Sequence, residues 1–270
     1  MLALSRFTIV TGKGGVGKTS LAYSLTAYLS KNGKKAVTYN FDEENAQTRK
    51  TETKTEAPVE VRSLNLIQEV ENYMAKKLRS RTIASWILKT PFFRAIFDML
   101  PGFAYVIYLG SVLEDLKNDP DLYAILDSPS SGHAITMLEA VKNFSDIFGS
   151  GVLFEDLQKM KQMLNDLSFT QTLITTLPSE MAMSEAKDLA KELETLPSGK
   201  VSVILNQAIC KTGINLESQE IPKIFKNRIE TELAVRAQNQ IDFEFPQVSS
   251  LNIKDITMHL ADTLKGVQIR

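Results

Sequence analysis

Short apolar runs alternate along the chain with longer segments in which apolar residues recur at helical spacing. Short runs of this kind are typical of buried strands, and the longer segments are typical of helices that pack on a sheet. Beyond the first strand, we expect strands at 35–41, 59–67, 122–126, 169–176 and 201–205. We expect helices at 67–80, 133–148, 153–166, 182–195, 222–239 and 253–266. This alternation predicts an α/β fold of three layers, with a mainly parallel sheet between helices.

The clearest chemical motif lies between the apolar run Phe7–Val10 and a helix that opens near Leu21. Residues 11–20 read TGKGGVGKTS and fit the pattern G-x-x-x-x-G-K-T, which binds nucleotide phosphates. Glycines allow backbone N–H groups to curl around phosphates without Cβ clashes, and a helix N-terminus favours anions. Lys18 is expected to reach the terminal phosphates, and the Thr19 hydroxyl to bind Mg²⁺. The predicted nucleotide-binding residues of this loop are Gly12, Gly14, Gly15, Val16, Gly17, Lys18, Thr19 and Ser20.

Composition narrows the function classes only slightly. The 270 residues carry a formal net charge of −1, which gives no general attraction to nucleic acid or to anionic membranes. The single cysteine, Cys210, allows neither an intramolecular disulfide nor a Cys-x-x-Cys zinc site. The opening residues MLALSRF lead directly into the first strand and leave no room for a signal peptide, so we expect a cytoplasmic protein.

A second lysine, Lys13, stands inside the loop, where an ordinary phosphate loop does not need one. The string KGGVGKT resembles the deviant Walker A loop of the ParA/MinD and ArsA ATPases. The resemblance implies that Lys13 is catalytic, because in those proteins this lysine crosses the interface of a nucleotide-dependent homodimer and touches the partner's nucleotide. The alternative is a solvated lysine that serves its own nucleotide or none.

Asp127 ends the apolar strand LYAIL and begins the string DSPSSGHAITMLEA. An aspartate at a strand end, level with the phosphate loop, can hold a water on Mg²⁺. The string resembles the switch of the ArsA family, which includes arsenite-efflux ATPases and ATPases that target tail-anchored membrane proteins. The resemblance implies that Asp127 joins Thr19 at the metal. This sequence differs from the family pattern at Pro129 and Ser130.

Two shorter matches extend the expected site. Asp42 follows the second strand, and in the resembled families an aspartate at this point orients the attacking water; a solvated acidic cluster at 42–44 is the alternative. Asn206 closes the strand VSVILNQ, and its amide offers both a donor and an acceptor to an adenine edge. Pro246 lies in a stretch that resembles the loop covering the base. The resemblance therefore implies ATP and Mg²⁺ as ligands, and the chain has no guanine-reading NKxD string.

Aromatic residues concentrate in 82–113, within a predicted helical insertion at 67–118 of a single domain that spans 1–270. Charges and prolines interrupt this stretch, so no run reaches the roughly 20 apolar residues of a membrane span. Its helices either belong to the core or present an apolar surface to a partner, as in the targeting ATPases. The polar run 43–57 is the best candidate for a mobile loop.

These patterns predict a P-loop NTPase fold and Mg²⁺-dependent ATP hydrolysis by a homodimer that switches its binding of an unidentified protein client, which could be hydrophobic. The family's arsenite-binding and zinc-binding cysteines are absent, so neither arsenite handling nor a zinc-clasped dimer is expected. A ParA/MinD-like positioning switch with peripheral membrane contact is the first alternative. The last helix has few positive charges, which favours docking on the core over membrane binding. A regulatory subunit that binds nucleotide with weakened catalysis is the second alternative.

Overall fold

A parallel sheet of seven strands forms the centre of the protein in a computed structural model that describes residues 2–41, 59–91, 102–212, 222–250 and 252–270. The strand order is β4-β3-β5-β2-β6-β7-β8. The strands in chain order are β2 (Phe7–Thr11), β3 (Lys35–Phe41), β4 (Val61–Leu64), β5 (Leu122–Asp127), β6 (Thr170–Thr176), β7 (Lys200–Ala208) and β8 (Phe243–Pro246). This order places β2, which leads into the glycine-rich loop, in the middle of the sheet.

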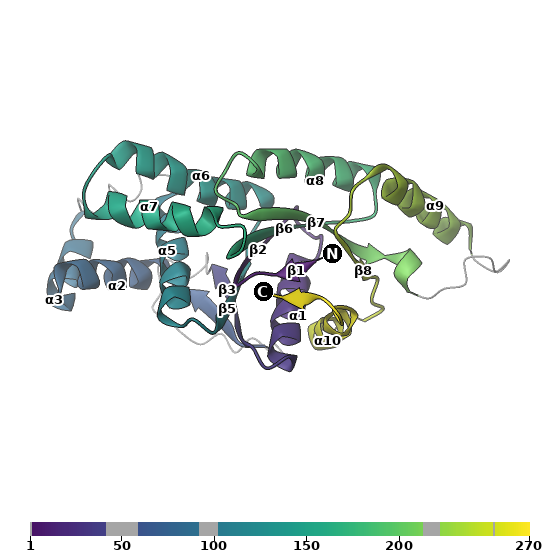
Figure 1. Ribbon diagram of the computed structural model, residues 1–270, viewed down its shortest axis with the longest axis horizontal. Helices are drawn as coiled ribbons and strands as arrows, with labels where there is room; N and C mark the ends of the chain where they lie inside the picture. Colours follow the sequence, from purple (N-terminus) through teal and green to yellow (C-terminus); the bar gives the residue numbers. More distant parts are fainter. Residues whose placement is uncertain (1, 42–58, 92–101, 213–221, 251) are drawn as a thin grey trace.

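Helices cover both faces of this sheet (Figure 1). One face packs against α1 (Lys18–Lys31) and α10 (Ile253–Thr263). The other face packs against α5 (Phe103–Asn118), α6 (Ser131–Phe148), α7 (Val152–Asn165) and α8 (Glu180–Leu193). The remaining helices are α2 (Leu66–Leu78), α3 (Arg81–Leu88), the short 3₁₀ helix η1 (Ile209–Lys211) and α9 (Lys223–Gln238). The expected three-layer α/β fold is therefore confirmed.

The central strand β2 is buried along its whole length because both of its faces lie in the core. Phe7 and Ile9 belong to the cluster shared with α5–α8, whereas Val10 belongs to the cluster under α1 and α10. Alternate side chains of a strand point to opposite faces, so a strand covered on both sides reads as a continuous apolar run. This is why the run at 7–10 was recognisable in the sequence.

The strands predicted after the first are confirmed at 35–41, 122–126, 169–176 and 201–205, and the strand expected at 59–67 is the shorter β4. The sequence did not predict β8, or the two-residue strands β1 (Ala3–Leu4) and β9 (Gln268–Ile269), which pair with each other. Two residues carry no periodicity, and β8 ends in proline, which weakens a strand prediction. The last helix, α10, docks on the core through Leu260, Ala261 and its C-cap residue Leu264, as expected.

The described part of the segment at 67–118 contains α2, α3 and α5. That this segment is a helical insertion within a single domain stays a prediction. Its aromatic-rich stretch divides in two. Leu109 and Val112 of α5 are fully buried against the sheet, whereas Trp86 of α3 is 70% exposed. Residues 92–101 and the polar run at 43–57 lie outside the described residues. Within the described ranges, no helix is long and apolar enough to cross a bilayer.

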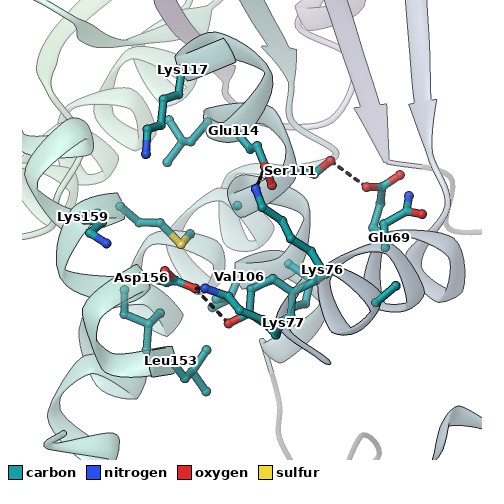
Figure 2. Close-up of a pocket in the computed structure, with 18 of the residues that line it drawn as sticks. Glu69, Lys76, Lys77, Val106, Ser111, Glu114, Lys117, Leu153, Asp156 and Lys159 are labelled. Atoms are coloured by element: carbon teal, nitrogen blue, oxygen red, sulfur yellow. Dashed lines mark hydrogen bonds and ion pairs between the residues drawn. The ribbon is translucent and has the colours of Figure 1, made fainter. Parts of the chain in front are cut away.

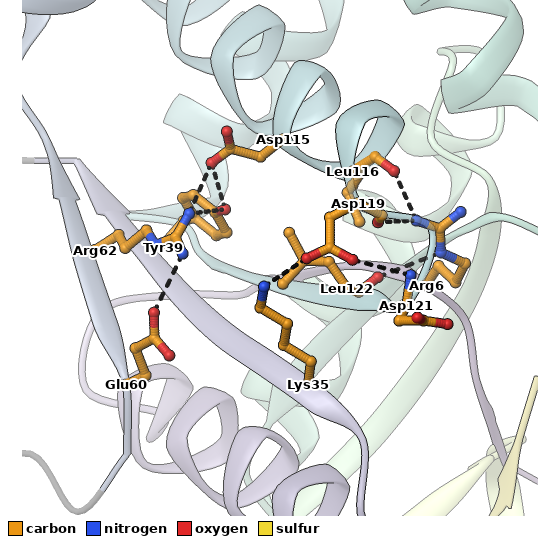
Figure 3. A network of polar contacts seen from close by, with 10 residues as sticks. All are labelled: Arg6, Lys35, Tyr39, Glu60, Arg62, Asp115, Leu116, Asp119, Asp121 and Leu122. Carbon is orange, nitrogen blue, oxygen red and sulfur yellow. Dashed lines mark hydrogen bonds and ion pairs between the residues drawn. The ribbon is translucent and has the colours of Figure 1, made fainter.

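A polar network ties β3 and β4 to α5 (Figure 3). The buried Tyr39 hydroxyl donates to Asp115 Oδ2 at 2.7 Å, and Arg62 Nη1 donates to the same oxygen at 3.0 Å. Burial raises the pKa of Tyr39 far above its usual range, with Asp115 adding to the shift, so the hydroxyl stays a donor. Lys35 extends the network to Asp119, at the end of α5, over 2.5 Å. These contacts thus hold β3, the strand that leads to Asp42, against α5 in the helical layer that covers the sheet.

Candidate functional site

The glycine-rich loop joins β2 to α1 at the carboxyl edge of the sheet. Gly12 has a φ of 142°, and a Cβ there would lie 2.3 Å from the carbonyl oxygen of Thr175 in the neighbouring strand β6. Gly17 caps α1 in the left-handed region, with φ 93° and ψ 28°, and a Cβ there would lie 2.3 Å from Asn206 Nδ2. The two glycines that frame the motif are therefore required by backbone conformation and by close neighbours.

Lys18, Thr19 and Asp127 meet at the start of α1. Asp127 ends β5, where it pairs in register with Val10 of β2, so its carboxylate lies beside the loop. The Thr19 hydroxyl donates to Asp127 Oδ2 at 2.7 Å, and the Lys18 ammonium donates to the Lys13 carbonyl at 3.1 Å. The other carboxylate oxygen, Asp127 Oδ1, is buried and has no hydrogen-bond partner among the residues that the structure describes. This oxygen is positioned to accept a cation or a water that a cation holds.

Burial shifts the pKa values of Asp127 and Lys18 in directions that disfavour their charged forms. It raises the pKa of Asp127 above its usual range, and the Thr19 hydroxyl and the Lys18 charge oppose that rise only partly. Burial likewise lowers the pKa of Lys18, and Asp127 opposes the shift. Each charged form is therefore less favourable than in water, and each would be stabilised by a ligand that brings the complementary charge.

Asn206 lies where the sequence predicted a nucleotide contact, and it also braces the phosphate loop. Its amide nitrogen donates to the Val16 carbonyl oxygen at 2.8 Å, and its side chain is buried. Pro246 ends the adjacent strand β8 and lies opposite Ala208 of β7. Both residues therefore occupy the carboxyl edge, and the amide nitrogen of Asn206 is already engaged by the protein. The adenine-reading role of Asn206 and Pro246 stays a prediction.

Lys13 forms an ion pair with Glu185 of α8 in the same chain, and its side chain is 57% exposed. The two residues also line a cavity of about 210 Å³ beside the loop, together with Val16, Ser131 and Thr176. Sequence reasoning missed Glu185, because a glutamate in an amphipathic helix carries no signal of a partner 172 residues away. It also missed Thr175, whose role rests on a backbone oxygen rather than a side chain.

Of the other predicted residues, Gly14 and Gly15 lie exposed in the loop, Val16 is buried, and Ser20 lies in the first turn of α1. Asp42 lies outside the described residues, so its water-orienting role stays a prediction. After Asp127, the Ser130 hydroxyl is 2.9 Å from His133 Nδ1 at the start of α6. The structure thus brings together the loop, Thr19, Asp127 and Asn206.

A strand, a glycine-rich loop and a helix N-terminus in this order, with an aspartate on the adjacent strand, define a P-loop nucleotide-binding protein. Residues 5–153 match the family described as Anion-transporting ATPase, and the chain belongs to this ArsA-type family. A protein of Aquifex aeolicus (strain VF5) named "Putative arsenical pump-driving ATPase 2" is 26% identical over 170 residues. The match covers 58% of this chain and 54% of that relative, so the chain spans about half of the relative's length.

Proposed function

We propose that the protein binds ATP with Mg²⁺ at the glycine-rich loop and hydrolyses the terminal phosphate bond. One observation carries the proposal: the Thr19 hydroxyl donates to one oxygen of Asp127, while the other oxygen is buried without a partner in the described part of the chain. A buried carboxylate oxygen without a partner is unfavourable, and a divalent cation or its water would satisfy it. The donor set, a hydroxyl and a carboxylate, is of the oxygen type that Mg²⁺ prefers.

The residues of the chain have separate tasks in this proposal. The loop N–H groups bind the phosphate oxygens, and the Lys18 ammonium offsets their charge in a partly dehydrated site where its attraction is strong. Thr19 and Asp127 would hold Mg²⁺, which supplies positive charge where negative charge develops during phosphoryl transfer. Asp42 would orient the attacking water, because positioning is the main contribution that a side chain can make to this reaction.

Asn206 and Pro246 would bind the adenine base. Because Asn206 Nδ2 is occupied by the Val16 carbonyl oxygen, the oxygen Oδ1 is the atom that would contact the base. A carbonyl oxygen accepts from the exocyclic amine of adenine and is repelled by the carbonyl oxygen that guanine carries at the same place. The orientation of the Asn206 amide therefore favours ATP over GTP.

We further propose that nucleotide favours a homodimer in which Lys13 leaves Glu185 for the partner's phosphates. The ion pair between Lys13 and Glu185 is exposed, and such pairs contribute only about 0–1 kcal/mol, so the exchange costs little. The switched client would be a protein that binds apolar side chains of the helical segment. Ile83 and Trp86 of α3 support this, since they are 50% and 70% exposed.

Calorimetry of ATP binding and phosphate release by Lys18→Ala and Asp127→Asn tests the core proposal. We expect Lys18→Ala to lose tight binding, and Asp127→Asn to retain binding but lose Mg²⁺-dependent turnover. Lys254→Ala, on the exposed side of α10, is the matched control and should behave like the wild type. ATP affinity in Lys18→Ala equal to that of the wild type would contradict the assignment. Slow turnover in the wild type with tight ATP binding would instead favour a regulatory subunit.

A further inference from the structure

A large cavity lies away from the phosphate loop, between α2, α5 and α7. Its volume is about 780 Å³, within the range of about 300–1,000 Å³ that is usual for small-molecule sites. Figure 2 shows that α2, α5 and α7 each contribute charged side chains around it. None of the described residues assigned to nucleotide binding lines this cavity.

The floor of the cavity is apolar. It is formed by side chains of α5 and α7, among them Val106, Leu113, Leu153, Leu157 and Met160. At Gly110 of α5 the floor has no side chain at all, and the nearest atom to a Cβ added there would be Met160 Sδ, at 3.8 Å. An apolar floor with two thioethers, from Met160 and Met163, can adapt to a flexible hydrocarbon chain.

The rim of the cavity is cationic. Three carboxylate residues line the cavity, and six lysine and arginine residues outnumber them. These cations are Lys76, Lys77, Arg79, Arg81, Lys117 and Lys159. Each carboxylate is already engaged, because Glu114 pairs with Lys76, Asp156 pairs with Lys77 at 2.5 Å, and Glu69 accepts from the Ser111 hydroxyl at 2.7 Å. Positive charge is therefore left in excess around the opening.

Two of the four lysines are available for a ligand. Lys117 and Lys159 are exposed, and neither forms an ion pair or hydrogen bond within the described ranges. In Figure 2 the Lys117 side chain extends from α5 toward the α7 side of the cavity, where Lys159 lies. An anionic headgroup between them would gain two charge-assisted contacts, while an attached chain would reach the apolar floor.

We propose that this cavity binds a single-chain amphipath with an anionic headgroup, specifically a fatty acid such as laurate. The carboxylate would lie between Lys117 and Lys159, and the hydrocarbon chain would cover the floor between α5 and α7. A small apolar molecule without charge would leave the cationic rim unused. A cationic amphipath would be repelled by it. This proposal is independent of nucleotide binding at the phosphate loop.

The test is a fluorescence titration of the full chain with dansyl-undecanoic acid, and displacement by laurate, dodecanol or dodecyltrimethylammonium. We expect saturable binding of one probe per chain, displacement by laurate, and much weaker displacement by the alcohol and the cation. Lys117→Glu/Lys159→Glu should weaken binding by about tenfold or more, and added salt should weaken wild-type binding. Lys254→Glu, which makes the same type of substitution at one exposed site on α10, should bind like the wild type.

A second pair of variants tests the floor without changing charge. Gly110→Phe places a ring in the cavity and should abolish binding, whereas Gly110→Ala makes only an ordinary contact and should retain it. Thermal melts of each variant verify that it folds. Absence of saturable binding to the wild type, or equal affinity in the double lysine variant, would overturn the proposal. Equal displacement by dodecanol, or displacement by an acidic amphipathic peptide but not by laurate, would also overturn it.

Discussion

Gly17→Ala tests whether the phosphate loop is held in shape by Asn206 before any nucleotide binds. Gly17 has φ 93° and ψ 28°, in a region that costs an L-residue roughly 1–2 kcal/mol. The added methyl would also lie 2.3 Å from Asn206 Nδ2, so the amide must move away from the Val16 carbonyl oxygen. Losing that hydrogen bond costs about 1 kcal/mol. The two effects together destabilise the folded chain by roughly 2–3 kcal/mol.

Thermal unfolding without nucleotide measures this cost. At about 2–4 °C per kcal/mol for a chain of this size, Gly17→Ala should lower the Tm by roughly 4–12 °C. Gly14→Ala is the matched control: its φ is not positive, and a Cβ there meets no atom of the described residues within 4 Å. That variant should lie within about 0.5 kcal/mol of the wild type.

A double-mutant cycle separates the steric effect from the backbone effect. In an Asn206→Ala background, the methyl of Gly17→Ala has no amide to displace, so only the backbone cost of about 1–2 kcal/mol should remain. Equal Tm values for Gly17→Ala and Gly14→Ala would refute the reasoning. Strict additivity of Gly17→Ala and Asn206→Ala would show that the added methyl does not act by displacing the Asn206 amide.

Buried or paired polar groups give three further predictions. Asp127→Asn should stabilise the ligand-free protein at neutral pH. Burial raises the pKa of the Asp127 carboxyl above its ordinary value of 3.8, so the free energy of unfolding of the wild type falls as the pH rises from 3.8 through the pKa of the folded state. Urea unfolding at several pH values checks this, and an advantage that persists below pH 3.8 would contradict it. Lys13→Ala should keep ATP affinity but lose roughly 10²-fold in turnover, measured by calorimetry and phosphate release; normal turnover would return Lys13 to a solvated role. Tyr39→Phe should cost about 1 kcal/mol, because its hydroxyl donates to Asp115 from a buried position, and an unchanged Tm would count against the network.

The sequence alone determined the class of fold and the centre of the site. The order of residues along a short stretch is sufficient to predict the phosphate loop. An apolar run, a glycine-rich loop and the start of a helix follow one another within 7–25, and each is predicted by short-range rules. Asp127 was recognisable for the same reason, because it ends a buried strand and begins a long matching string. Both features depend on neighbours in the chain.

Only the tertiary structure decided how distant segments act on this site. Glu185 forms an ion pair with Lys13, and the Asn206 amide donates to the Val16 carbonyl oxygen. The Thr175 carbonyl oxygen leaves no room for a side chain at Gly12. Each partner is remote in sequence. These contacts arise because parallel strands bring their carboxyl ends to one edge, and no local pattern encodes which side chains then meet. The cavity between α2, α5 and α7 has the same origin, since helix packing separates its apolar floor from its cationic rim.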